Sequence, residues 1–346
     1  MIKAEWCNYK LVFNFLAKTS REEMRTKETY FVRIFDTDQP EIFGLGECAL
    51  FKGLSADDVP DFENRLDEAC RQPLDSLPQM SAIRFGFETA LADFQNGGKR
   101  IILNNDWISG LHPIAINGLI WMGDKAEMVR RVEEKISKGF KILKLKIGGI
   151  NFDEEISILK SIRERFDHKQ LEIRLDANGS FTPVNALDRL DKLSKFDIHS
   201  IEQPIAAGQR EAMRRICIES PIAIALDEEL IGFNSTEAKR EILSEIRPQY
   251  IILKPSLCGG LRQSDEWIDL AHEFNVGWWA TSALESNIGL NAIAQWVSTK
   301  NNHLAQGLGT GELYTNNIPS PLTMEGCRLN YRPDKKWIIP DLVWQD

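Results

Sequence analysis

The chain has 346 residues, 43% of them hydrophobic and 27% charged, which are ordinary proportions for a globular protein. Its formal net charge of -9 excludes the general basic excess of many nucleic-acid-binding proteins. No apolar run approaches the roughly 18 residues that a membrane span needs. The sequence therefore predicts a globular protein that binds neither nucleic acid nor a membrane.

The N-terminus and the cysteines predict a cytoplasmic location. The first residues lack the basic, apolar and small-residue order of a signal peptide. Six cysteines are scattered along the chain and form no CxxC pair. Cysteines in this arrangement are typical of a reducing compartment, so we expect free thiols.

Residues 1–105 have the pattern of an α+β domain. Alternating apolar residues in 9–17, 28–36 and 41–50 predict three antiparallel strands. The apolar residues of 81–95 instead recur at helical spacing, which predicts an amphipathic helix after the strands.

The remainder of the chain alternates between strands and helices. Apolar runs begin near residues 114, 141, 171, 199, 222, 250, 276 and 304. Amphipathic segments lie between most of them, with helix starts expected at Asp124, Thr182 and Asn234. This order predicts a parallel (β/α) barrel over 106–316 rather than a doubly wound sheet, and no GxGxxG fingerprint argues otherwise. We expect the last segment, 317–346, to return to the first domain.

Five charged residues recur at nearly one interval, each at the end of an apolar run: Lys146, Asp176, Glu202, Asp227 and Lys254. The gaps of 30, 26, 25 and 27 residues match the length of a strand–helix unit. A charged side chain that ends an apolar strand is costly unless it is paired or binds a metal. The spacing therefore predicts that all five converge at the carboxyl-terminal mouth of the barrel.

The three acidic positions predict a metal site. Any one acid alone is more often a helix cap or part of a surface salt bridge. Three carboxylates on adjacent strand ends, however, can share one hard cation, for which Mg²⁺ is our first expectation and Mn²⁺ the alternative. Alternation places Asp227 and Glu229 on one side of the chain, so the sequence leaves open which of them binds.

The lysines predict proton transfer. Lys144 and Lys146 share one face of their strand, although two such lysines in isolation fit an exposed edge strand equally well. Across the predicted metal site from them, Lys254 ends a later strand. A lysine near a metal and another cation has its pKa lowered towards the range where it accepts a proton. Two lysines around a metal therefore indicate chemistry on a carbon acid next to a carboxylate.

These motifs resemble the enolase superfamily, in its muconate-lactonising branch. The resemblance covers nearly the whole chain and rests on KLK, LDAN, EQP, LDEE and LKPSLCGG in order. It implies an N-terminal α+β capping domain and a modified TIM barrel of (β/α)7β type. It also implies that Asp176, Glu202 and Asp227 hold Mg²⁺. The chain departs from the pattern at Glu229, where a small polar residue is common, and at Thr281, where Ser is frequent.

Within that branch, the chain is most similar to the members that dehydrate 2-succinyl-6-hydroxy-2,4-cyclohexadiene-1-carboxylate to o-succinylbenzoate in menaquinone biosynthesis. The segments that carry this similarity are 46–55, 174–178, 281–290 and 305–311. The resemblance implies that Lys146 removes the proton and that Lys254 stabilises the enediolate, while Lys144 assists. Further residues would contact the substrate or lie just behind it: Arg174, Asn178, Ser282, Gly307 and Gly309.

Two classes of alternative stay open. An N-succinylamino acid racemase, or a related isomerase of the branch, would use the same two lysines as paired acid and base. Dipeptide epimerases usually carry an acidic pair at the eighth strand, where this chain has GLGTG, and acid-sugar dehydratases commonly have a His–Asp dyad, where it has Lys254. A non-catalytic binding protein is expected to lose at least one of the five residues, and all five are present. The sequence gives no prediction of oligomeric state.

Overall fold

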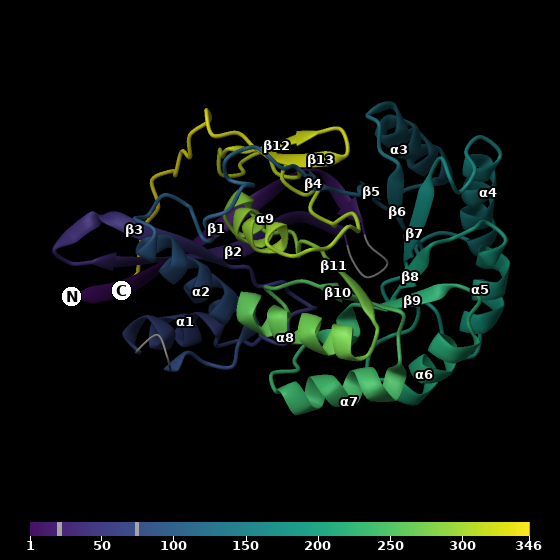
Figure 1. The fold of residues 1–346 in the computed structure, drawn as a ribbon, viewed down its shortest axis with the longest axis horizontal. Helices are drawn as coiled ribbons and strands as arrows, with labels where there is room; N and C mark the ends of the chain where they lie inside the picture. The colour runs from purple at the N-terminus through teal and green to yellow at the C-terminus, as the bar shows by residue number, and fades with distance from the viewer. Residues whose placement is uncertain (19–22, 73–75, 346) are drawn as a thin grey trace.

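The computed structural model describes residues 1–18, 23–72 and 76–345. Its N-terminal part is an antiparallel sheet of β1 (Ile2–Lys18), β2 (Glu23–Asp36) and β3 (Gln39–Cys48), in that order. Helices α1 (Phe62–Arg71) and α2 (Ser81–Gln95) bury one face of this sheet in an apolar core (Figure 1). The three predicted strands and the helix at 81–95 are thus confirmed. We call this part the cap.

Glycines allow β3 and α2 to pack closely. A Cβ atom added at Gly46 would lie 1.9 Å from the carbonyl oxygen of Gly86, and one added at Gly44 would lie 1.9 Å from that of Ala90. Both obstacles are backbone atoms, which cannot rotate away. Any larger residue would therefore force the strand and the helix apart.

The second part is a parallel sheet ringed by helices (Figure 1). Within the described segments, its strands are β5 (Gly118–Ile120), β6 (Ile142–Lys146), β7 (Glu172–Asp176), β8 (Ser200–Glu202), β9 (Ala223–Leu226), β10 (Tyr250–Leu253) and β11 (Gly277–Ala280). The helices that connect β5 to β11 are α3 (Lys125–Ser137), α4 (Phe152–Arg163), α5 (Ala186–Ser194), α6 (Arg210–Glu219), α7 (Thr236–Ile246) and α8 (Gly260–Glu273). Each strand pairs with its sequence neighbour, which is the strand order of a (β/α) barrel.

The barrel closes through a segment much shorter than the predicted eighth strand. Gln306 forms a parallel bridge with Ile116, and Gly307 forms one with Thr281. Backbone hydrogen bonds run from this segment to both sides, including 2.7 Å from Gly307 N to Ala280 O. The modified TIM barrel and its cap are therefore confirmed, with the eighth position filled by single bridges rather than by a regular strand.

The chain departs from the predicted elements in three other places. The residues of β4 (Ile114–Ala115), which we expected to open the barrel, pair instead with a C-terminal hairpin of β12 (Leu322–Glu325) and β13 (Arg328–Tyr331). Helix α9 (Asn287–Ser298), almost wholly buried, follows β11. Among the expected helix starts, Asp124 caps α3 through Glu127 N, whereas α7 is capped by Ser235 instead of Asn234, and α5 begins at Ala186, after Thr182.

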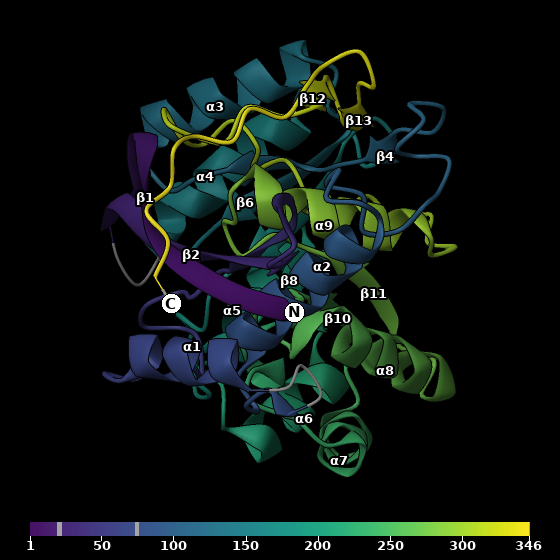
Figure 2. The same cartoon turned by 90° about the vertical axis from the view of Figure 1, so that its left-hand side faces the viewer.

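The C-terminal segment lies against the cap (Figure 2). Trp6 and Gln345 exchange two backbone hydrogen bonds, of 3.1 and 2.8 Å. Side chains from this segment, including Trp337 and Trp344, pack around Phe31 of β2. No helix in the described part of the chain is both long and apolar enough to cross a bilayer.

The close approach of β3 to α2 gives a stability prediction. Replacement of Gly46 by Ala places a methyl group on the Gly86 carbonyl and should lower the free energy of unfolding by about 3 kcal/mol. Gly97→Ala is a matched control, because that glycine has a φ of +79° but only Lys99 nearby, so it should cost about 1 kcal/mol. Urea unfolding measures both values. Equal losses would contradict the packing argument.

Candidate active site

Strand register brings the five predicted residues to one end of the barrel. Lys146 lies opposite Asp176 in the pairing of β6 with β7, and Asp176 lies opposite Glu202 in that of β7 with β8. Asp227 directly follows β9, and Lys254 directly follows β10. All five therefore lie at the carboxyl-terminal ends of neighbouring strands, and each is buried.

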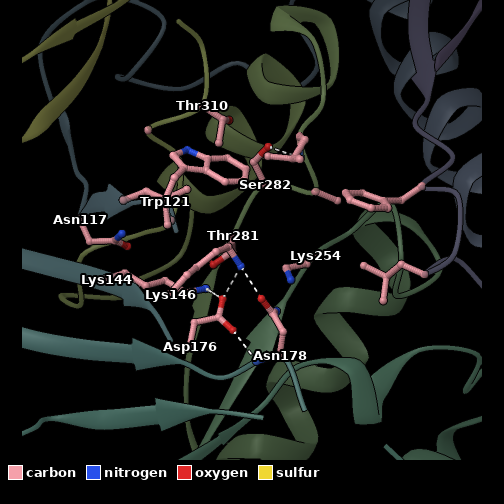
Figure 3. A pocket seen from close by; sticks show the side chains of 17 residues that line it. Asn117, Trp121, Lys144, Lys146, Asp176, Asn178, Lys254, Thr281, Ser282 and Thr310 are labelled. Carbon is pink, nitrogen blue, oxygen red and sulfur yellow. Dashed lines mark hydrogen bonds and ion pairs between the residues drawn. The ribbon is translucent and has the colours of Figure 1, made fainter. Parts of the chain in front are cut away.

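A cavity opens between these strand ends and the cap (Figure 3). Predicted residues that line it are Lys144, Lys146, Asp176, Asn178, Lys254, Ser282, Gly307 and Gly309. The sequence reasoning missed most of its apolar wall and several polar groups: Phe51, Leu54, Asn117, Leu119, Trp121, Ala283, Leu284 and Thr310. Several of these lie in segments that had been singled out for other reasons, but no pattern in the sequence marked their side chains as facing the mouth.

Three lysines and three carboxylates form one buried network. Lys144 Nζ lies 2.9 Å from Asp176 Oδ2 and 2.6 Å from Glu202 Oε2. Lys146 Nζ donates to Asp176 Oδ2 at 2.9 Å and to Asn178 Oδ1 at 2.8 Å. On the other side, Lys254 pairs with Asp227 and lies 3.9 Å from Glu202 Oε1. Figure 3 shows Lys146 and Lys254 approaching the cavity from different sides.

The network shifts the proton affinities of its members. Burial alone would lower the pKa of Lys254, but Asp227 and Glu202 outweigh burial and raise it. The pKa of Lys144 is likewise raised, because Asp176 and Glu202 outweigh its burial. Carboxylates rather than cations are the nearest charges here, whereas the lowered lysine pKa that we expected concerns a lysine beside a bound metal. For Glu202, burial and then the facing Asp176 raise the pKa well above its usual range.

The geometry separates Asp227 from Glu229. The carboxylate of Glu229 accepts hydrogen bonds from Gly208 N at 3.0 Å and from Gln203 Nε2 at 3.2 Å. These bonds hold it on the loop that follows β8, away from the lysines. Asp227 instead faces Lys254. Of the two, Asp227 is the one that the structure brings to the cluster.

The donor set fits a hard divalent cation, although the side chains do not stand ready for one. No group of three or more His, Cys, Asp or Glu side chains in the described segments lies in a metal-holding arrangement. Lys144 instead bridges Asp176 and Glu202, with its Nζ 2.6 Å from Glu202 Oε2. The other oxygen of Glu202, Oε1, accepts no hydrogen bond from the described residues, so it keeps coordination capacity at the centre of the cluster.

Arg174 does not reach the cavity. Its guanidinium donates to Glu172 Oε1 at 2.8 Å and to the Ala305 carbonyl at 2.9 Å, and it lies over the ring of Trp279. It is thus buried inside the barrel, beneath the charged cluster. The sequence could not tell this position from the mouth, because alternation places Arg174 and Asp176 on the same face of the strand.

Glu155 is a further residue that the sequence reasoning missed. It lies on α4, is 2% exposed, and its Oε1 accepts a hydrogen bond of 2.5 Å from Gly148 N. Gly148 belongs to the turn that follows Lys146, so this carboxylate fixes the backbone just beyond the lysine. Burial raises the pKa of Glu155 to about 7.

A family model described as Enolase C-terminal domain-like matches residues 127–333. The match spans every strand end that carries one of the five charged residues. The chain belongs to the enolase superfamily. This confirms the resemblance that the strand-end motifs indicated.

Individual relatives show which kinds of enzyme within the superfamily the chain resembles. An o-succinylbenzoate synthase from Desulfotalea psychrophila is 45% identical over 354 residues, which cover 91% of this chain and 95% of that relative. The crystal structure of MenC from Desulfotalea psychrophila LSv54 matches with a TM-score of 0.86 at 42% identity, and the match covers 95% of this chain and 99% of that one. An N-succinyl-L-Arg/Lys racemase from Bacillus cereus is 27% identical over 191 residues, or 55% of this chain and 48% of that relative. The chain is thus much more similar to the synthase than to the racemase.

The raised pKa of Glu155 predicts a pH-dependent stability. Between its ordinary pKa of 4.5 and about 7, this carboxyl is protonated when folded and ionised when unfolded. The folded state then binds more protons, so stability falls as the pH rises through this window, by up to about 3 kcal/mol. Glu155→Gln should remove that part of the slope. Urea unfolding at several pH values from 4.5 to 7.5 tests this, and parallel curves for the wild type and the variant would contradict it.

Proposed function

We propose that this protein catalyses the o-succinylbenzoate synthase reaction, the syn-dehydration of 2-succinyl-6-hydroxy-2,4-cyclohexadiene-1-carboxylate to o-succinylbenzoate in menaquinone biosynthesis. The observation that carries the proposal is the 45% identity to a synthase over nearly the full length of both chains. The cavity, with lysines on two sides and carboxylates beneath, supplies the groups that this chemistry needs. The free thiols of all six cysteines, each in a described segment, support a cytoplasmic location.

Lys146 is the proposed base. Its amine, when neutral, takes the proton from the ring carbon next to the carboxylate, and the electron pair of that bond moves into an enediolate. The resulting ammonium then gives the proton to the departing hydroxyl group on the same face. The carbon–oxygen bond breaks, water leaves, and the ring becomes aromatic. The contacts of Lys146 Nζ with Asp176 and Asn178 hold it in one orientation for both transfers.

Lys254 and Lys144 suit an electrostatic role. Lys254 approaches the cavity from a different side than Lys146 and pairs with Asp227, and Lys144 lies between Asp176 and Glu202. An ammonium group in such a place stabilises an oxyanion. This geometry supports Lys254 as the group that stabilises the enediolate from the other side of the cavity, with Lys144 assisting.

Asp176, Glu202 and Asp227 are the proposed holders of Mg²⁺. When bound, Mg²⁺ supplies positive charge that stabilises the oxygens of the enediolate. Glu202 Oε1, which accepts no hydrogen bond from the described residues, supports this assignment. A divalent charge among the carboxylates also offsets their effect on the nearby lysines and so lowers the lysine pKa values.

The walls of the cavity suit a dianion with an apolar ring. Trp121, Leu119 and Leu284 offer an apolar surface, and Phe51 and Leu54 close it from the cap. Thr310 offers a hydroxyl group that makes no hydrogen bond with the described residues, and Ser282, Gly307 and Gly309 line the cavity beside it, where the succinyl arm would lie. Glycines at these two positions carry no acidic group that would bind an α-ammonium.

The first functional prediction concerns Lys146. Lys146→Ala should lower the rate of aromatic product formation by about 10³-fold or more, because it removes the only proposed base. The assay incubates the protein with the dehydration substrate and Mg²⁺ in D₂O and follows the product by ultraviolet absorbance.

The same assay separates the alternative activity. N-succinyl amino acids are offered in parallel, and α-deuteration is followed by NMR. Rapid deuteration by the wild type without any aromatic product from the cyclohexadiene would overturn the dehydratase proposal in favour of a racemase.

The second functional prediction concerns the metal. Asp227→Asn should weaken Mg²⁺ binding by more than about 100-fold, as expected for a direct ligand. Glu229→Gln should change it by no more than about threefold, since that carboxylate acts only through a distant charge. Isothermal titration with Mg²⁺ measures both, and thermal unfolding checks that both variants are folded. A loss of binding in Glu229→Gln alone would reverse the assignment.

A further inference from the structure

A second buried carboxylate lies beside the active site but outside the proposed chemistry. Glu285, fully buried, lies in the segment between β11 and α9 and is not among the described residues that line the cavity. Its Oε1 accepts a hydrogen bond from Ser256 Oγ, and its Oε2 accepts one of 2.5 Å from Ser282 Oγ. One carboxylate thus joins two loops that follow different strands.

Both serines belong to segments that the reaction uses. Ser282 lines the cavity itself. Ser256 is fully buried in the turn that starts at Lys254, where Leu257 N and Cys258 N donate to the Lys254 carbonyl at 2.8 and 3.0 Å. The carboxylate of Glu285 therefore links the turn that carries a lysine of the site to the wall that faces the substrate.

The cap contributes a parallel contact to the same segment. Glu47 of β3 accepts hydrogen bonds from Ser286 N at 3.0 Å, Ser286 Oγ at 2.6 Å and Gly289 N at 2.9 Å. A Cβ atom at Gly289 would lie 2.8 Å from Glu285 Cβ and 3.0 Å from Glu47 Oε2. The two carboxylate side chains therefore pack against one glycine, which no larger residue could replace without moving them.

We propose that Glu285 is a positioning residue that fixes Lys254 and Ser282 relative to each other, on a segment that Glu47 of the cap also holds. Docking of the cap is then part of assembling the active site. The inference rests on the proposed function for the roles of Lys254 and Ser282. In this role Glu285 contacts no substrate, but it determines the positions of Lys254 and Ser282, which do.

The test compares Glu285→Gln with Glu88→Gln. Glu88 is the control, because its carboxylate also accepts two hydrogen bonds from a separate segment, from Leu261 N at 2.7 Å and Arg262 N at 3.0 Å, and it does not line the active cavity. Glu285→Gln should lower kcat by about 10-fold or more. Glu88→Gln should keep kcat within about twofold of the wild type, even if it lowers the Tm as much as Glu285→Gln does. A kcat within about twofold of the wild type for Glu285→Gln would overturn the proposal.

Ser256→Ala covers the case in which Glu285→Gln does not fold. This variant removes one hydroxyl group and should lower kcat several-fold with little change in KM, since it disturbs the Lys254 turn and not the substrate pocket. An unchanged kcat would sink the proposal. The rate of α-proton exchange in D₂O is measured for both the cyclohexadiene and N-succinyl amino acids. Failure of the dehydratase assignment, with exchange only on amino acids, is therefore distinguishable from failure of the positioning role.

Discussion

The mutual neutralisation of three lysines and three carboxylates at the mouth of the barrel is the constraint on which the rest of the structure depends. Each charge is buried, and each alone would cost several kcal/mol of desolvation. Parallel strands in register deliver both signs to one layer, with Lys146 beside Asp176 and Asp176 beside Glu202. The barrel therefore accommodates charges that would each destabilise it if they were unpaired. It places them at its mouth, where the proposed chemistry occurs.

The cap completes this arrangement from above. Phe51 and Leu54 cover the cavity with apolar surface, which lowers the local dielectric and strengthens each charge interaction inside. Cap and barrel are held together by buried polar contacts as well as apolar packing, most of all at Glu47. These contacts end on the loop that also carries Ser282. The loop that carries Ser282 therefore belongs both to the interface between cap and barrel and to the wall of the active site.

Much of the fold and the charged site could be predicted from the sequence, because both correspond to patterns that repeat at a regular interval along it. Apolar runs at the strand–helix interval located the regular strands, and the charge that ends each run located the site. The irregular eighth strand and the start of α5, expected at Thr182, were harder to predict. Single bridges and helix starts depend on a few backbone hydrogen bonds rather than on a repeated pattern. The β12–β13 hairpin likewise pairs with residues 114–115 across some 200 positions of sequence, and such long-range pairing leaves no local signal.

The sequence by itself determined the barrel with its cap, the five strand-end charges and the superfamily, since these follow from spacing and residue type. Only the tertiary structure showed that Asp227, and not Glu229, lies in the charged cluster. Both lie on one side of the chain, but Gly208 N binds the carboxylate of Glu229. The tertiary structure also placed Arg174 beneath the site, and it brought Glu285 into contact with Ser256 and Ser282 on two different loops. Side-chain direction and charge balance depend on neighbours distant in sequence, and folding alone brings those neighbours together.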